Sequence, residues 1–337
     1  MSAYGAHDAG VLATIGATPL VRLSRLLPGS HFRTFAKLEA ANPGGSIKDR
    51  SAYVMLAAAM DAGLVTPGRS VVVESSSGNL GVGLAQACRY FDLRFICVVD
   101  PRTNAQNVAL MRAYGAQVQM VTEHDPATGE YLPVRIQRVR ELVATLPDAY
   151  CPDQYSNPGN ALAHRTTMRE IAEALAWRID YLICAISSCG TLRGCAEYAR
   201  EQGLPVRIVA VDAEGSAITR PPRGRRLISG HGAAVAPVLY QRGLADEVVY
   251  ASDLECLVGC RRLARREAIL AGGSSGAVVS ALQRMADRIP IGANCVLILP
   301  DSGERYLDTI YDDAWATAQF GEVAELWDDK TAEVVPC

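Results

Sequence analysis

Residues 70–81 read SVVVESSSGNLG: a short apolar run, a turn of Ser, Gly and Asn, and the start of an apolar helical stretch. A run that is apolar at nearly every position indicates a strand buried on both faces, as in a parallel sheet covered by helices. The same order recurs at 180–194, where DYLICAIS leads into SCGTLRG. In such sheets ligands bind beyond the carboxyl ends of the strands, so we expect the chemistry in these two turns.

The rest of the chain repeats this alternation of apolar runs and amphipathic stretches. Further strands are predicted at 94–100, 117–122, 206–212 and 294–300. The expected helices are 49–63, 80–91, 104–114, 134–146, 160–177, 192–203, 253–271 and 275–288. Two groups of strands separated by helices predict an α/β protein with two three-layer domains and mostly parallel sheets.

Composition limits the partners that the protein can have. The 337 residues carry a formal net charge of −3, which favours neither nucleic acid nor an anionic membrane surface. No apolar run approaches the roughly 18 residues of a membrane span, and the N-terminus lacks the features of a secretory signal. We therefore expect a cytoplasmic protein whose ten cysteines, which show no CxxC spacing, are reduced and buried. The five scattered histidines predict no metal site.

The segment 42–50, NPGGSIKDR, combines a Pro-Gly-Gly turn with a lysine in the predicted first turn of a helix. Because the helix dipole is positive at this end, we expect Lys48 to have a lowered pKa and to react as a free amine. A lone lysine in a turn would otherwise be an ordinary surface residue. The turns that follow the strands favour the reactive interpretation.

Both turns offer hydroxyls and backbone N–H groups to an anion. Residues 75–81 have room for a carboxylate, although an ordinary capped turn would look the same. Residues 187–194 suit a phosphate monoester, since a helix is expected to begin near Thr191. They contain neither a Walker lysine nor the GxGxxG of a dinucleotide-binding fold. A fixed phosphate opposite a reactive lysine is the outline of a pyridoxal-phosphate (PLP) site.

The segment 42–50 resembles the Schiff-base segment of the cysteine synthase and cystathionine β-synthase family, the fold-type II PLP enzymes. Five more segments resemble motifs of this family in the family's order. They are Ser76–Asn79, Gln154–Pro158, Ser187–Thr191, Gly272–Gly276 and Pro300–Leu307. The resemblance spans residues 13–310 and implies a PLP-dependent replacement of the β-substituent of a serine-type amino acid.

The resemblance also implies a role for each matching residue. Lys48 forms the Schiff base and shuttles the α-proton, while Asn79 bonds the ring hydroxyl of the cofactor. The substrate carboxylate is held by Ser76, Ser77, Asn79 and Gln154. The PLP phosphate is held by Ser187, Ser188, Cys189, Gly190 and Thr191. Ser302, or its neighbour Asp301, faces the pyridine nitrogen.

For the architecture, the resemblance implies a smaller mobile domain at 40–154 that carries the carboxylate loop. Residues 1–39 with 155–325 would form the larger, phosphate-binding domain, and 326–337 a C-terminal tail. We expect small amino acids as substrates and a homodimer as the assembly.

Departures from the usual sulfhydrylase pattern concern the second substrate. Tyr155 replaces a usual Phe, Ser188 stands in a loop that is usually richer in glycine, and Arg135 lies in a segment that differs. An arginine fork suits a carboxylate, so these residues predict a larger anionic nucleophile than sulfide. They resemble the branch that joins O-phosphoserine to glutamate in siderophore pathways, giving N-(2-amino-2-carboxyethyl)-L-glutamate, a precursor of 2,3-diaminopropionate.

Two alternatives follow from the same residues. The first is a cysteine synthase that uses sulfide with O-acetylserine or O-phosphoserine. The second is a catalytically silent PLP-fold protein that serves as a binding partner. The presence of both Lys48 and Asn79 argues against the silent protein.

Overall fold

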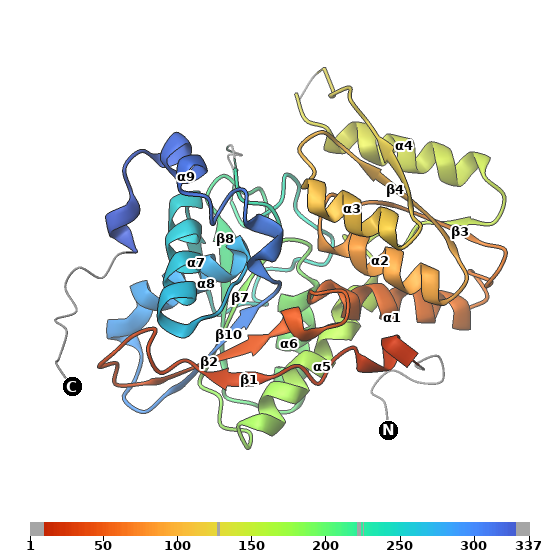
Figure 1. The fold of residues 1–337 in the computed structure, drawn as a ribbon. Coiled ribbons are helices and arrows are strands. Elements are labelled where there is room, and N and C mark those ends of the chain that lie inside the picture. The colour runs from red at the N-terminus through yellow and green to blue at the C-terminus, as the bar shows by residue number, and fades with distance from the viewer. Residues whose placement is uncertain (1–9, 127–128, 221–223, 225, 328–337) are drawn as a thin grey trace.

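The computed structural model describes residues 10–126, 129–220, 224 and 226–327, which form two lobes built on separate sheets (Figure 1). The larger sheet has the strand order β1-β2-β10-β7-β8-β9 and the smaller one β5-β4-β3-β6. All neighbouring strands run parallel except β1 and β2. The strands are β1 (Leu20–Arg22), β2 (Arg33–Leu38), β3 (Val71–Ser75), β4 (Arg94–Val99), β5 (Gln117–Met120), β6 (Ala149–Tyr150), β7 (Tyr181–Ala185), β8 (Arg207–Ala213), β9 (Glu247–Ala251) and β10 (Asn294–Leu299).

The larger sheet is covered on both faces because successive side chains of its central strands point in opposite directions. On β10, Cys295, Leu297 and Leu299 join one buried cluster, while Val296 and Ile298 join the other. The first cluster is covered by α7 (Asp253–Glu267), α8 (Gly273–Met285) and α9 (Asp313–Phe320). The second is covered by α5 (Pro158–Ala174) and α6 (Gly190–Glu201).

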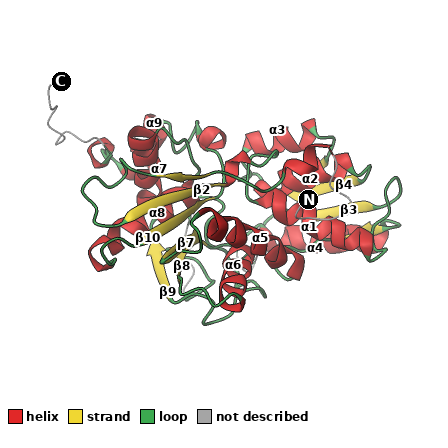
Figure 2. Cartoon of the chain, turned by 90° about the horizontal axis from the view of Figure 1, so that it is seen from below, coloured by secondary structure: helices red, strands yellow, loops and turns green. Residues whose placement is uncertain are grey.

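The smaller sheet is built in the same way. Val72 of β3 packs into the cluster beneath α1 (Lys48–Asp61), α2 (Asn79–Tyr90) and α3 (Ala105–Ala113). Its neighbours Val71 and Val73 pack against α4 (Leu132–Thr145) on the other face. The two sheets lie side by side in the view from below (Figure 2). The predicted α/β fold with two three-layer units and mostly parallel sheets is therefore confirmed.

Element ends differ from the sequence prediction where capping decides them. Helix α5 begins at Pro158, because the Asn157 side chain accepts a hydrogen bond from the Gly159 N–H. Helix α7 ends at Glu267 instead of 271, because Ala268 adopts a left-handed φ of 55°.

Strands β1, β2, β6 and β9 were not predicted. Short 3-10 helices lie at Gly10–Thr14, Glu39–Ala41, Ala286–Arg288, Gly303–Tyr306 and Ala324–Leu326.

A buried ion-pair network attaches α1 of the smaller lobe to the larger lobe. The Arg50 guanidinium lies 2.7 Å from Glu39 and 2.7 Å from Glu170, and the Lys37 amine lies 2.6 Å from Glu170. Buried charges persist only when they are paired in this way. The network fixes the first turn of α1, and with it Lys48, at the junction of the lobes.

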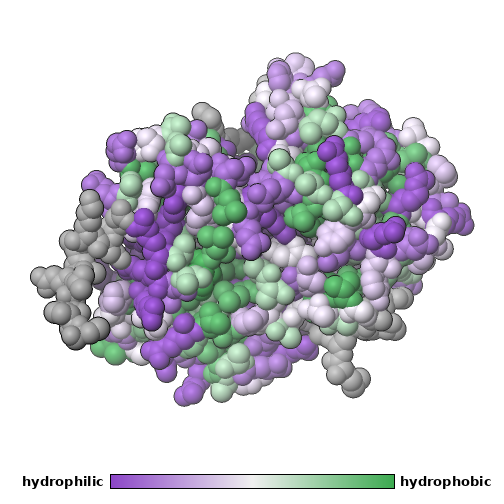
Figure 3. Space-filling view, in the orientation of Figure 1, coloured by the Kyte–Doolittle hydropathy of each residue, from purple (hydrophilic) through white to green (hydrophobic). Residues whose placement is uncertain are grey.

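The surface agrees with the composition. On the face drawn in Figure 3, hydrophobic residues gather near the middle of the view, and hydrophilic residues prevail around them. Among the described helices, none is long and apolar enough to cross a membrane. The nine cysteines within the described ranges are free, and all but Cys151 are buried. The tail predicted at 326–337 lies almost wholly outside the described residues.

Candidate functional site

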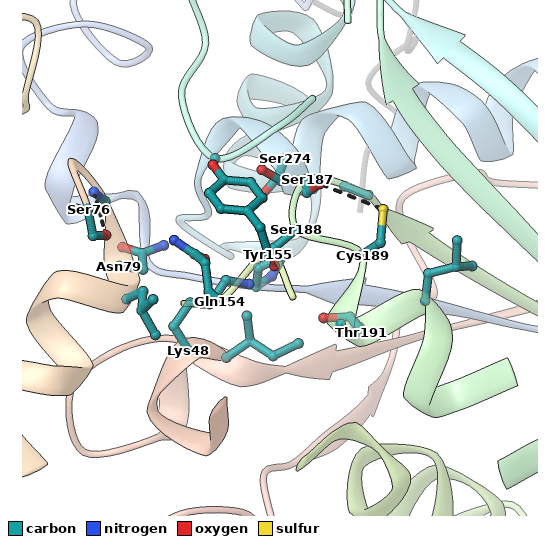
Figure 4. Close-up of a pocket in the computed structure, with 18 of the residues that line it drawn as sticks. Lys48, Ser76, Asn79, Gln154, Tyr155, Ser187, Ser188, Cys189, Thr191 and Ser274 are labelled. Atoms are coloured by element: carbon teal, nitrogen blue, oxygen red, sulfur yellow. Dashed lines mark hydrogen bonds between the residues drawn. The ribbon is translucent and has the colours of Figure 1, made fainter. Parts of the chain in front are cut away.

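The two predicted turns meet in one pocket between the lobes (Figure 4). The pocket is a cavity of about 130 Å³ that residues of both lobes line. Ser76 and Asn79 approach from one side and Cys189 and Thr191 from the other, with Lys48 and Gln154 between them. Twelve of the thirteen predicted site residues line it: Lys48, Ser76, Ser77, Asn79, Arg135, Gln154, Tyr155, Ser187, Ser188, Cys189, Gly190 and Thr191.

Lys48 is the first residue of α1, as predicted, and its amine faces the pocket. Its pKa is lowered, but the main cause is burial; we had expected the helix dipole. The nearby charges of Asp301 and Glu39 oppose the shift without reversing it. A lysine held here is a stronger candidate for a free amine than an exposed one.

Residues 187–191 form a cradle at the start of α6. Ser187 donates to the Gly232 carbonyl at 3.0 Å, and Cys189 turns the chain with a left-handed φ of 65°. Gly190 must be glycine, because a Cβ there would overlap the Asn160 side chain. Ser188, Gly190 and Thr191 line the same pocket, so the N–H groups at the start of α6 and two hydroxyls are available there to an anion.

The loop 75–79 lies across the pocket from this cradle. The Ser76 hydroxyl accepts a hydrogen bond from the Gly81 N–H at 3.0 Å, which caps the start of α2. Asn79 is held between the lobes: its Nδ2 donates to Asp301 at 2.8 Å, and its Oδ1 accepts from Arg305. The side chain of Asn79, which belongs to the smaller lobe, is therefore fixed at the pocket wall by two residues of the larger lobe.

Ser302 is the predicted site residue that does not line the pocket. Its hydroxyl accepts from the Glu304 N–H at 3.3 Å and caps a 3-10 helix. The preceding Asp301 is buried, and its Oδ2 accepts from Tyr306 at 2.7 Å as well as from Asn79. Its Oδ1 has no hydrogen-bond partner among the described residues, and burial raises its pKa. Neither neighbour lines the pocket, but Asp301 is the one with a buried side chain, and that side chain bonds the pocket residue Asn79.

Arg135 lies in the first turn of α4 and is only 8% exposed, although most arginines are exposed. Its Nε lies 3.3 Å from Asp100 Oδ2. Within the described part of the chain, Nε and Nη1 make no hydrogen bond and are buried. Buried donors without partners are costly, so the guanidinium favours an anion in the pocket. Tyr155 lines the same pocket, and the charge of Arg135 acts on its hydroxyl.

Sequence reasoning assigned no role to several residues at the pocket. Ser274 and Pro300 line it, and Asn160 and His164 lie directly behind the cradle. Ser274 belongs to the turn 272–276, which was recognised as a motif without a role. Asn160 and His164 are four residues apart on an otherwise apolar helix face, a pattern that marks two buried polar side chains on one side of α5.

The comparisons with known proteins agree with this geometry. The family model described as "Pyridoxal-phosphate dependent enzyme" matches residues 11–301. The N-(2-amino-2-carboxyethyl)-L-glutamate synthases of Ralstonia nicotianae and Cupriavidus metallidurans are 44% and 43% identical to the chain, over 306 and 309 residues. In both cases 90% of each chain is covered.

Solved structures give the same fold. A crystal structure of O-ureido-L-serine synthase is 33% identical, with a TM-score of 0.81, and covers 91% of this chain and 98% of its own. The O-acetylserine dependent cystathionine β-synthase from Helicobacter pylori is 31% identical, with a TM-score of 0.83, and covers 90% of this chain and 99% of its own. All of these similarities extend over both lobes and the pocket between them.

Proposed function

Since this chain belongs to the pyridoxal-phosphate dependent enzymes and is a β-replacement enzyme, we propose that it joins O-phospho-L-serine to L-glutamate. Phosphate leaves the β-carbon of the first substrate, and the amine of the second bonds to that carbon. The product is N-(2-amino-2-carboxyethyl)-L-glutamate. The observation that carries the proposal is the buried Arg135, whose Nε and Nη1 make no hydrogen bond to the described residues, although Nε is ion-paired with Asp100.

The residues of the pocket fit the cofactor. Lys48 offers an amine with a lowered pKa, and the cradle at the start of α6 offers N–H groups and hydroxyls to a phosphate. Asn79 lines the pocket, and we assign its second Nδ2 proton to the ring hydroxyl. We assign the pyridine nitrogen to Asp301, whose buried Oδ1 is free of hydrogen bonds to the described residues, and no longer to Ser302. When bound, PLP supplies an electron sink for the α-carbon.

Different residues of the chain carry out proton transfer, substrate binding and closure of the pocket. The amine of Lys48 removes the α-proton and later returns it, and its lowered pKa favours the free amine that this role needs. Ser76, Ser77 and Gln154, which line the pocket opposite the cradle, hold the substrate carboxylate with Asn79. We propose that the smaller lobe, residues 40–154, moves to close over the substrate and to exclude water.

The second substrate requires a further anion site. Glutamate carries two carboxylates, whereas sulfide needs no cation fork. The Arg135 guanidinium can bind a carboxylate or a phosphate through two N–H groups. Tyr155 and Ser188 line the same pocket and add hydroxyls that Phe and Gly cannot supply. These three side chains favour glutamate and O-phosphoserine over sulfide and O-acetylserine.

We further propose that the product serves siderophore biosynthesis as a precursor of 2,3-diaminopropionate, and that the enzyme acts as a homodimer. The support for the pathway is the reaction named for the Ralstonia and Cupriavidus relatives.

Product analysis tests the proposal. The enzyme is offered O-phosphoserine or O-acetylserine, each with glutamate or sulfide, and the products are identified by mass spectrometry. The expected result is N-(2-amino-2-carboxyethyl)-L-glutamate from O-phosphoserine and glutamate, with the fastest turnover of the four mixtures. Efficient formation of cysteine with no consumption of glutamate would refute the proposal and support a cysteine synthase.

A further inference from the structure

A chain of buried polar side chains lies directly behind the cradle. It consists of Ser51 on α1 and of Asn160, His164 and Thr167 on α5, all of them 0–1% exposed. It ends at two hydroxyls of the cradle: Asn160 Nδ2 lies 3.1 Å from Ser188 Oγ, and His164 Nε2 lies 3.3 Å from Thr191 Oγ1. Hydrogen bonds in such a chain have directions, because each hydroxyl has one proton to give.

The amide of Asn160 can be oriented in only one way. One side of it faces the carbonyl oxygen of Gln154 at 2.8 Å, which can only accept, so this side is the Nδ2 group. The second Nδ2 proton is directed to Ser188 Oγ. The Oδ1 atom then faces Ser51, which donates its one proton to it at 2.7 Å. Ser188 and Ser51 are both fixed by this amide.

The neighbours of His164 fix its tautomer. Thr167 Oγ1 lies 3.3 Å from Nδ1 and bonds no other group in the described ranges, so it can donate its proton to an unprotonated Nδ1. Ser51, whose proton is used by Asn160, presents a lone pair to Nε2 at 3.2 Å. Nε2 therefore carries the hydrogen. Burial and the charges of Lys48 and Arg50 lower the pKa of His164 well below its ordinary value, so the ring is neutral.

These directions determine what the cradle can do. The Ser188 hydroxyl accepts a hydrogen bond from Asn160. The Nε2–H of His164 is shared by two acceptors, the hydroxyl oxygens of Thr191 and Ser51. Both hydroxyls keep their own protons, and neither bonds any other described residue. The free protons face the pocket, where a phosphate oxygen would accept them. A carbonyl or hydroxyl chain with the opposite direction would present lone pairs there and repel an anion.

We propose that Asn160 and His164 are positioning residues that force Ser188 and Thr191 to act as hydrogen-bond donors toward a phosphate in the cradle. The inference rests on the proposed placement of the PLP phosphate at residues 187–191. These residues form a buried polar network that contacts α1 close to Lys48. The network orients the two hydroxyls as donors in advance, so the cradle favours an anionic ligand group.

The tautomer of His164 is directly measurable. In the holoenzyme labelled with ¹⁵N-histidine, a His164→Gln variant identifies the signals of this ring. Nδ1 is expected to give the downfield shift of an unprotonated nitrogen, and Nε2 the shift of an N–H, with no change between pH 6 and pH 8. A ring protonated at Nδ1 alone, or a doubly protonated ring, would overturn the inference.

Cofactor affinity tests the consequence. His164→Leu removes the donor and should weaken PLP binding about tenfold, since a hydrogen bond to a charged group loses its alignment. His164→Gln places an amide N–H near the position of Nε2 and should stay within about threefold of wild type. Ser280→Ala is the matched control: it removes a buried hydroxyl on α8, bonded to the Glu255 carbonyl, and should leave PLP affinity unchanged.

The outcomes separate this inference from the function on which it rests. If Thr191→Val leaves PLP affinity unchanged, the phosphate is held elsewhere and its proposed placement fails. If Thr191→Val weakens PLP binding while His164→Leu does not, the placement stands and the positioning role of His164 is wrong. Melting temperatures of the apoenzymes show whether each variant is folded. If a variant does not fold, the ¹⁵N shifts of His164 in the wild-type enzyme still test the inference.

Discussion

Replacing Arg135 by glutamine removes the cation that we place at the second substrate. The change keeps a polar side chain of similar reach and leaves Asp100 with its hydrogen bond from the Arg102 N–H at 2.8 Å. A hydrogen bond to a charged group contributes about 1.5–3 kcal/mol. Losing one such bond to glutamate or O-phosphoserine should therefore raise the KM of that substrate about ten- to a hundredfold.

Folding needs its own control, because Arg135 is also paired with a buried carboxylate. Breaking a buried pair can cost about 3–5 kcal/mol, so Arg135→Lys, which keeps the charge and loses the fork, is measured beside Arg135→Gln. Arg138→Gln is the matched control. Arg138 lies one turn further along α4, is exposed, and among the described residues pairs with Glu141 and Gln119. Its loss should change neither KM nor, beyond about 0.5 kcal/mol, the free energy of unfolding.

Steady-state kinetics with each substrate varied in turn gives the answer. We expect Arg135→Gln to bind PLP with its usual visible absorption band and to lose affinity for an anionic substrate. If Arg135→Gln keeps the wild-type KM for both glutamate and O-phosphoserine, the buried guanidinium does not contact substrate, and its role is limited to the pair with Asp100.

Four further predictions follow from the pocket and its surroundings. Lys48→Ala should fold and abolish both turnover and the visible absorption band of the Schiff base; an active variant would remove Lys48 from the mechanism. Tyr155→Phe should slow the addition of glutamate while PLP binding stays normal, as single-turnover kinetics can resolve; an equal loss in both would indicate a packing role. The free energy of unfolding of Cys189→Gly, measured by urea titration, should lie within about 1 kcal/mol of the wild-type value. Cys189→Val puts a β-branched residue at a φ of 65°, so its free energy of unfolding should fall by more than about 1 kcal/mol. Burial raises the pKa of Glu74 from about 4.5 to about 8, so this carboxyl stabilises the fold below pH 4.5 and its contribution is lost as pH rises through 8, by at most about 1.4 kcal/mol per pH unit; Glu74→Gln should flatten the pH dependence of apoenzyme stability over this range.

The architecture could be predicted where burial is complete. Strands such as 70–74 and 294–300 are apolar at nearly every position, and the structure places them at the centres of the two sheets. Strand β2 was missed because its sequence, RTFAKL, mixes charged and apolar residues. Its Lys37 is buried nonetheless, paired with Glu170, which lies 133 positions further along the chain. No local pattern indicates such a partner.

The pocket could be predicted because its residues lie in turns that follow strands or open helices. The sequence could not show which of Ser302 and Asp301 to assign to the pyridine nitrogen. That assignment depends on which side chain bonds Asn79 and Tyr306 and which one caps the next 3-10 helix. The roles that we propose for Asn160 and His164 were missed for the same reason. Each has hydrogen-bond partners on three separate segments, and only the folded chain brings these together.

The central claim is that this pocket selects glutamate as the nucleophile, and a competition measures it directly. Wild-type holoenzyme receives O-phosphoserine with equal concentrations of ¹⁵N-glutamate and sulfide, and the two products are counted by mass spectrometry. We predict that the ¹⁵N-labelled glutamate adduct dominates, and that Arg135→Gln shifts the ratio toward cysteine. Cysteine as the main product of the wild type, with the ratio unchanged in the variant, would contradict the account.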